Sequence, residues 1–93
     1  MTEENKQRVR NQIEMDNKKA EYGYEWHIID GLLGEPVSAL VCREDCELIY
    51  VDMDGYPNKC IARYDENINR FIGVSEWLKG NYMCSVIAYR RIK

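Results

Sequence analysis

The chain has 93 residues, of which 45% are hydrophobic, 31% charged and 11% aromatic, a composition typical of one small folded domain. It contains no apolar run near the roughly 18 residues that a membrane helix needs and it begins with a polar, charged segment, so we expect a cytoplasmic protein without a membrane partner and exclude a multidomain enzyme. The net charge is −3, and residues 24–79 carry eleven acids against five bases, which disfavours nucleic acid as a partner because phosphate binding needs an excess of Lys and Arg.

Residues 2–20 are predicted to form a helix. Two acids in the first turn and two bases near the end suit the helix dipole: Glu3, Glu4, Lys18 and Lys19. The apolar side is thin, because Val9 and Ile13 lie one turn apart and Asp16 interrupts the row. We therefore expect this helix to lie loosely on the rest of the domain. The alternative is that it pairs with the same helix of a second copy.

After Gly23 the pattern changes from helical to alternating, which predicts antiparallel strands. Turn residues such as Asp54 and Gly55 separate apolar and β-favouring runs, and these runs predict strands at residues 24–29, 37–43, 47–53, 59–64 and 82–92, with a short extended piece at 71–74. The strand at 82–92 is expected to be the longest, and Ser75 is expected to cap one helical turn that ends at Gly80.

The fold class is therefore α+β. A helix in residues 1–22 is followed by an antiparallel β domain in residues 23–93, with about five strands that form a small curled sheet or a partly open barrel. Trp26 and Trp77 are the expected anchors of the core. Seven tyrosines exceed what such a core needs, so several are expected at a surface or a subunit contact: Tyr22, Tyr24, Tyr56 and Tyr82.

Four cysteines raise the question of a metal site: Cys42, Cys46, Cys60 and Cys84. Zinc usually takes two close pairs of ligands, whereas here only Cys42 and Cys46 lie close in sequence, with three residues between them. We interpret the cysteines as reduced and buried, acting as small hydrophobic side chains. A zinc-stabilised module remains an alternative, and no cofactor is predicted.

No pattern in the chain indicates catalysis. His27 is the single histidine, and no acid or nucleophile is placed beside it. Residues 52–55 resemble the start of a calcium loop, but the sixth position of that loop is Pro57 and the twelfth is Arg63, which are the wrong residues for calcium. No glycine-rich phosphate loop precedes a helix. The protein is therefore not expected to be an enzyme.

The C-terminal segment carries a family resemblance. Residues 86–90 read Val-Ile-Ala-Tyr-Arg, and they follow an Asp-Gly turn at residues 54–55 and a tryptophan, Trp77. This ending resembles that of short accessory proteins of tailed bacteriophages and prophages, which finish in Ile-Ile-Ala-Tyr-Arg or close variants. The resemblance covers about residues 36–92. It implies a bacterial host cytoplasm, where such proteins often bind a host protein or sequester a small molecule.

These observations predict a non-enzymatic binding protein, expected as a homodimer, that engages a host protein through an acidic surface bearing tyrosines. The candidate binding residues are Glu44, Asp45, Tyr56, Tyr82, Tyr89, Arg90 and Arg91. The alternative function is binding of a nucleotide or another small anion by Arg90, Arg91 and nearby tyrosines.

Overall fold

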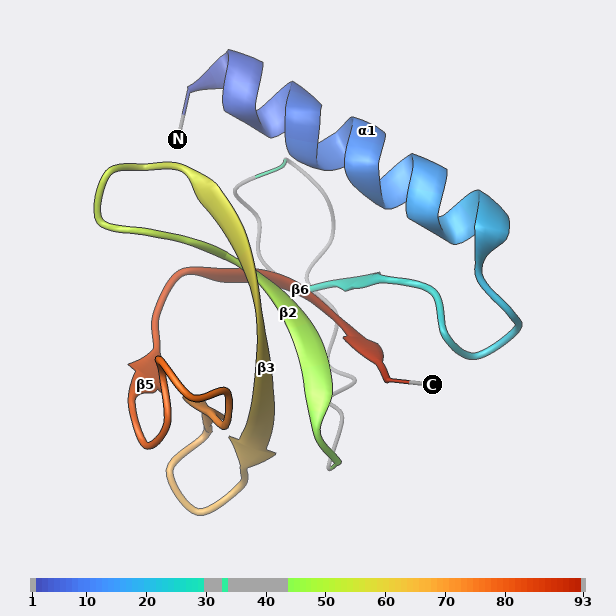
Figure 1. Cartoon of the computed structure of the whole chain (residues 1–93). Helices are drawn as coiled ribbons and strands as arrows, with labels where there is room; N and C mark the ends of the chain where they lie inside the picture. Colours follow the sequence, from blue (N-terminus) through green and yellow to red (C-terminus); the bar gives the residue numbers. More distant parts are fainter. Residues whose placement is uncertain (1, 30–32, 34–43, 93) are drawn as a thin grey trace.

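The computed structural model describes residues 2–29, 33 and 44–92 (Figure 1). One helix and six strands lie in this part of the chain: α1 (Glu3–Lys19), β1 (His27–Ile28), β2 (Cys46–Val51), β3 (Pro57–Asp65), β4 (Arg70–Gly73), β5 (Tyr82–Met83) and β6 (Val86–Arg91). The strands form one antiparallel sheet in the order β1-β6-β2-β3-β4-β5, and the sheet does not close into a barrel. The predicted α+β class with a small curled sheet is therefore confirmed. The strand predicted at residues 37–43 lies outside the described residues.

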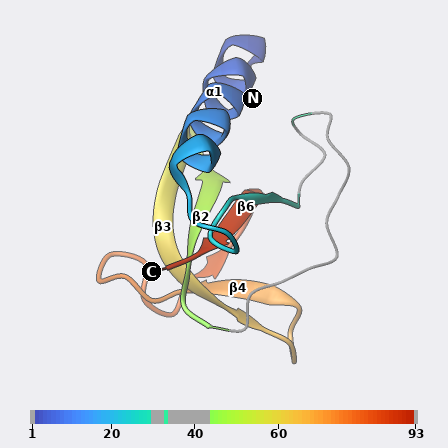
Figure 2. The ribbon, with the colours of Figure 1, turned by 90° about the vertical axis from the view of Figure 1, so that its right-hand side faces the viewer.

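The helix α1 begins and ends close to the predicted residues. The Thr2 hydroxyl oxygen accepts a hydrogen bond from the Asn5 amide at 3.1 Å, which caps the first turn. Asn5 is buried and its side chain donates to the carbonyl oxygen of Gly55 at 3.3 Å, in the turn between β2 and β3. In Figures 1 and 2, α1 lies above the strands and beside this hairpin. Side-chain contacts therefore tie the helix to the sheet, in contrast to the loose packing expected from its thin apolar stripe.

The buried residues divide into two clusters on opposite sides of the sheet. The helix-side cluster contains Val9, Ile13, Trp26, Leu33, Ile49, Ile87 and Ala88. The other cluster contains Cys46, Leu48, Cys60, Ala62, Phe71, Met83 and Tyr89. Strand β2 contributes to both clusters through its alternating side chains, because Leu48 points to one side and Ile49 to the other.

A β-bulge in β6 places two consecutive residues in the helix-side cluster. Ile49 pairs with Ala88 and Tyr50 pairs with Val86, so Ile87 has no opposite residue on β2. Ile87 and Ala88 are both fully buried. The bulge therefore gives α1 a wider apolar platform than strict alternation along β6 would provide.

The continuous strand predicted at residues 82–92 is wrong, because the chain breaks into β5 and β6 at Cys84 and Ser85. Ser85 has a φ of 53°, in the left-handed region, and this residue turns the chain from the β4 edge toward β2. The longest of the described strands is instead β3, with nine residues. Residues 75–80 form turns in place of the predicted helical turn.

The two tryptophans have opposite environments. Trp26 is 4% exposed, which confirms its predicted place in the core, whereas Trp77 is 91% exposed and the prediction for it is wrong. In the loop between β4 and β5, the neighbouring Leu78 packs on the core instead. Gly73 permits this close approach, because a Cβ atom there would collide with the backbone and side chain of Leu78.

No helix in the described part of the chain has the length and apolar character needed to cross a membrane.

Candidate functional site

Among the strands that the structure describes, half of β3 has a neighbour on one side only. Strand β2 pairs with β3 from Pro57 to Ala62, whereas β4 pairs with β3 only from Ala62 to Asp65. One further bond, from the Val74 amide to the Ile61 carbonyl oxygen at 3.0 Å, extends the contact with β4. Residues 57–60 therefore form an open edge of the sheet, which we call the β3 edge.

Two hydrogen bonds define which backbone groups face outward along the β3 edge. The Tyr56 carbonyl oxygen accepts from the Asp52 amide at 2.9 Å, toward β2, and the Ile61 carbonyl oxygen accepts from Val74, toward β4. Backbone groups alternate in direction along a strand, so the N–H and C=O of Lys59 point away from β2. Within residues 2–29, 33 and 44–92, no backbone group bonds to them on that side.

A cavity of about 470 Å³ lies beside the β3 edge, next to the loop between β4 and β5. Its lining residues are Glu47, Tyr50, Lys59, Cys60, Ile61, Ser75, Trp77 and Leu78. Apolar and aromatic side chains contribute much of this lining, and Trp77 is almost completely exposed beside it. The cavity therefore places a large aromatic side chain next to outward-facing backbone groups of Lys59.

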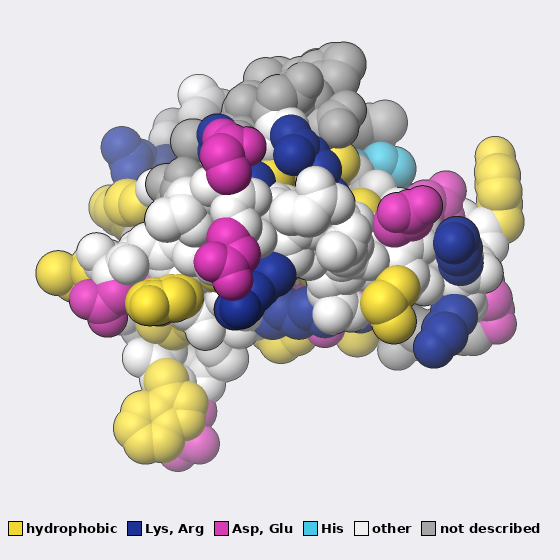
Figure 3. Space-filling model, turned by 90° about the horizontal axis from the view of Figure 1, so that it is seen from above, with side chains coloured by type: hydrophobic (Ala, Val, Ile, Leu, Met, Phe, Trp, Pro, Cys, Tyr) yellow, Lys and Arg dark blue, Asp and Glu magenta, His cyan; other side chains and the backbone are white. Residues whose placement is uncertain are grey.

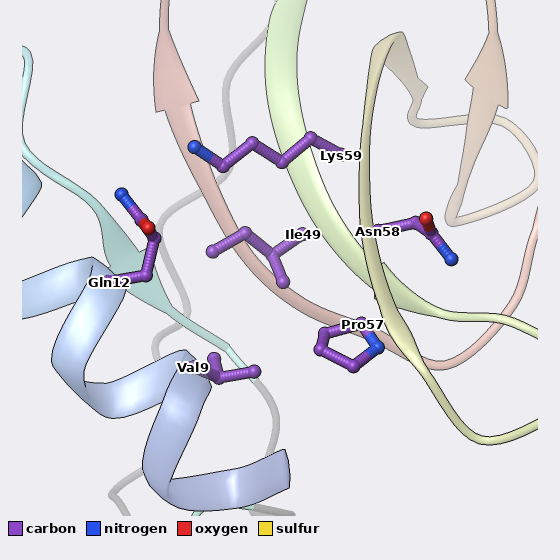
Figure 4. Close-up of a pocket in the computed structure, with 6 residues that line it drawn as sticks. All are labelled: Val9, Gln12, Ile49, Pro57, Asn58 and Lys59. Carbon is purple, nitrogen blue, oxygen red and sulfur yellow. The ribbon is translucent and has the colours of Figure 1, made fainter.

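A second cavity, of about 300 Å³, lies between α1 and the first residues of β3 (Figure 4). Its lining residues are Val9, Gln12, Ile49, Pro57, Asn58 and Lys59. Figure 4 shows the side chain of Lys59 extending from β3 toward the Gln12 side chain on α1. Because Lys59 lines both cavities, the β3 edge is bordered by a hollow on each side.

Asp16 holds the helix side of this region together. Its carboxylate accepts hydrogen bonds from Trp26 Nε1 at 2.9 Å and Gln12 Nε2 at 2.7 Å, and it lies 3.4 Å from Lys59 Nζ. Burial alone would raise the pKa of Asp16, but the bonds from Trp26 and Gln12 and the charges of Lys59 and Arg90 outweigh it and lower the pKa below its usual value. Asp16, which interrupts the apolar row of α1, therefore anchors this helix to the sheet.

Arg90 belongs to the same network. Its Nη2 lies 2.8 Å from Glu47 Oε1 on β2, its Nη1 lies 3.6 Å from Asp16 Oδ2, and the guanidinium stacks over the Trp26 ring. The contacts with Glu47 and Asp16 occupy guanidinium N–H groups of Arg90 that would otherwise bind an anion. Arg91 is exposed, and Arg90 and Arg91 both line a third cavity, of about 310 Å³, together with Lys19 and Tyr24. The structure therefore engages Arg90 in contacts within the protein, whereas Arg91 is exposed, and both side chains border this cavity.

The other candidate binding residues do not come together. Asp45, immediately before β2, accepts a hydrogen bond from Arg63 Nε at 2.8 Å, and the exposed Glu44 lies beside it in sequence. Tyr56 lies at the opposite end of β2, in the hairpin, and Tyr82 lies on the edge strand β5. Figure 3 shows acidic and basic side chains interleaved on the α1 side of the molecule.

Tyr89 is 2% exposed and belongs to the core. Its ring stacks on His27, with 5.1 Å between centroids, and lies 6.2 Å from the Phe71 ring. The Tyr89 ring therefore does not present a surface to a ligand. His27, the single histidine, is held beside it on the neighbouring strand β1.

The three described cysteines differ in environment. Cys46 and Cys60 are buried, whereas Cys84 is exposed. Burial, together with the charge of Glu47, raises the pKa of Cys60 to about 11, so its thiol stays protonated at neutral pH. Among the described residues, no group of three or more metal-ligating side chains gathers. Cys42, the fourth residue of the proposed zinc set, lies outside them.

Comparison with known proteins gives no relative: no family model, no curated protein and no solved structure matches the chain. The β3 edge was not among the sequence-predicted sites, although the sequence contains a signal for it. Proline and lysine early in a strand are typical of an unpaired edge, and Pro57 and Lys59 both follow the Asp-Gly turn.

Proposed function

We propose that this chain is a non-catalytic binding protein that engages a partner protein at the β3 edge and at the adjoining cavity lined by Trp77, which we call the Trp77 cavity. The observation that carries the proposal is the 91% exposure of Trp77 beside a cavity of about 470 Å³. Tryptophan is strongly enriched among the residues that dominate protein interfaces, because it buries a large area at a small cost in conformational entropy.

The charges around the cavity favour binding over catalysis. Glu47 pairs with Arg90, and Lys59 pairs with Asp16, so each charged group that lines the cavity already has an oppositely charged neighbour. Neither pair is arranged as an acid and base facing a common open point. The apolar remainder, including Tyr50, Leu78 and Trp77, suits a hydrophobic side chain of a partner.

The resemblance of the C-terminal segment to phage and prophage accessory proteins suggests that the partner is a bacterial host protein. The exposed acids have less support as the contact surface, because Glu44 and Asp45 lie at the opposite end of β2 from Tyr56. Binding of a small anion also has less support, because Arg90 is engaged within the protein. The proposal therefore keeps a host protein as partner and moves the contact to Trp77.

Site-specific photo-crosslinking in bacterial cells tests this proposal. A benzophenone amino acid is placed at Trp77 in one variant and at Tyr22 in a matched control, since Tyr22 is 99% exposed but lines none of these cavities. We expect one discrete adduct from position 77 and none from position 22. The purified partner, once identified by mass spectrometry, should bind the wild-type chain at least tenfold more tightly than Trp77→Ala. Equal labelling at both positions, or no adduct at 77, would contradict the proposal.

A further inference from the structure

We propose that the occupant of the β3 edge is an extended segment of the partner polypeptide, which adds to the sheet as a new strand beside Lys59. This inference rests on the proposed function and specifies how the partner binds. Addition of a strand to an open sheet edge takes its affinity from main-chain hydrogen bonds and its selectivity from the cavities that receive alternate side chains.

The geometry of the β3 edge meets the first requirement, which is a set of outward-facing main-chain groups. Lys59 offers one N–H and one C=O on this side, and Pro57 offers a C=O without an N–H. A paired strand would lie about 4.8 Å from β3 and needs about 3.3 Å per residue. Residues 57–60 therefore accommodate a short segment of about four residues before the loop at Val74 closes the edge.

The two cavities meet the second requirement. A partner residue directly opposite Lys59 would direct its side chain to the same side of the sheet as the Lys59 side chain, toward Gln12 on α1. The residues before and after it would direct theirs to the side of Cys60, toward Leu78 and the Trp77 cavity. The arrangement therefore selects an alternating segment with an apolar residue, a central polar residue and another apolar residue.

Charge indicates which central residue fits best. The Lys59 side chain is 42% exposed, although it lies 3.4 Å from Asp16. Opposite charges on directly paired residues stabilise neighbouring strands, and like charges destabilise them. A carboxylate at the central position of the segment would meet the exposed part of Lys59 across the new strand pair. We therefore expect glutamate to be preferred over lysine there.

The same argument disfavours a second copy of this chain at the β3 edge. A twofold antiparallel pairing centred on Lys59 would place two lysines directly opposite each other. It would also bring Pro57 from each copy into the new ladder, and neither proline has an N–H to donate. A segment of a different polypeptide avoids both penalties.

Peptide titration with amide-resolved NMR tests the inference. The probe is a seven-residue peptide in which valine alternates with polar residues and glutamate occupies the centre. Two modified peptides carry N-methyl groups on alternate amides, one set on each edge of the extended chain. We expect the unmodified peptide and one methylated form to shift the Lys59 amide and the Trp77 indole signals and to slow exchange of the Lys59 amide at least tenfold. The other methylated form should do neither.

Two variants of the protein complete the test. Lys59→Pro removes the outward N–H from an edge position where proline is tolerated, so it should reduce peptide affinity at least tenfold while Trp26 near-ultraviolet circular dichroism is retained. Lys59→Ala keeps the N–H and should lose only the preference for glutamate over lysine.

Peptide-induced shifts at Trp77 with an unprotected Lys59 amide would overturn strand addition but leave partner binding in place. Equal binding of both methylated peptides would also overturn strand addition. So would self-association of the protein, seen as a mass that doubles with protein concentration, if the Lys59 amide were then protected from exchange without peptide. The absence of a crosslinked adduct at position 77, by contrast, would contradict the proposed function itself.

Discussion

The guanidinium of Arg90 lies 4.4 Å from the centroid of the Trp26 ring, and this stacking connects the last strand to the segment that follows the helix. Nε1 of the same indole ring donates a hydrogen bond to Asp16 on α1. An arginine, a tryptophan and an aspartate from three separate parts of the chain thus form one unit. Its role is to hold α1 against the sheet, which in turn shapes the cavity beside Lys59.

Replacement of Arg90 by alanine should destabilise the fold. The change removes the cation–π contact with Trp26 and leaves the half-buried Glu47 without its cation, so we expect a loss of about 2 kcal/mol in the free energy of unfolding. Arg91→Ala is the matched control, because Arg91 is the exposed neighbour, and it should leave stability unchanged. Urea unfolding followed by circular dichroism measures both. Equal losses of unfolding free energy in the two variants would contradict a stabilising role of the Arg90 contacts.

Stability should fall in acid partly because of Asp16. The pKa of Asp16 is lowered in the folded protein, so this group contributes stability above its unfolded pKa of about 3.9 and loses it as the pH falls through the lower folded value. Asp16→Asn should therefore be less stable than the wild type at pH 7, and the difference should shrink below pH 4. Glu4→Gln, on the exposed side of α1, serves as the control. A pH-independent difference would contradict the assignment.

The two tryptophans should respond very differently to substitution. Trp26→Phe removes a buried indole and its hydrogen bond to Asp16, which should cost about 2–3 kcal/mol of unfolding free energy. Trp77→Phe should leave the unfolding free energy unchanged, because the side chain is exposed in the folded state. Thermal and urea unfolding of both variants provide the comparison. Destabilisation by Trp77→Phe as large as by Trp26→Phe would mean that Trp77 is packed.

Thiol reactivity should separate Cys84 from the buried cysteines. In a Cys42→Ser background, a disulfide reagent at pH 8 should modify Cys84 within seconds to minutes. Cys60 should react at least a hundredfold more slowly, because it is buried and its pKa of about 11 leaves little thiolate. Cys84→Ser should abolish the fast phase. A fast phase that survives this change would place a second accessible thiol in the fold.

Local patterns in the sequence predicted much of the fold. The charged first and last turns of α1, the alternating residues of β2 and β3 and the Asp-Gly turn at residues 54–55 act over short distances along the chain, and each appears in the structure. The break at Ser85 was not predictable in this way. Both halves of residues 82–92 favour strands, and only the pairing of β5 with β4 and of β6 with β2 separates them.

The candidate site was harder to predict because it depends on contacts between distant residues. Arg90 and Arg91 look equivalent in the sequence, yet the pleat directs one to Glu47 and Asp16 and leaves the other in solvent. Trp77 is a large aromatic residue and is therefore expected in the core. Leu78 instead lies close to Gly73 and packs on the core beside it. Asp16 likewise acquires its role only when Trp26 and Lys59 reach it.

The most direct test of partner binding beside Trp77 is fluorine NMR of protein labelled with 5-fluorotryptophan, with Trp77→Phe used for assignment. We expect two signals: one from Trp77 that shifts between light and heavy water, and one from Trp26 that does not. The peptide with alternating valines and a central glutamate should move the Trp77 signal alone. Movement of the Trp26 signal instead, or a Trp77 signal that is insensitive both to heavy water and to peptide, would contradict the account.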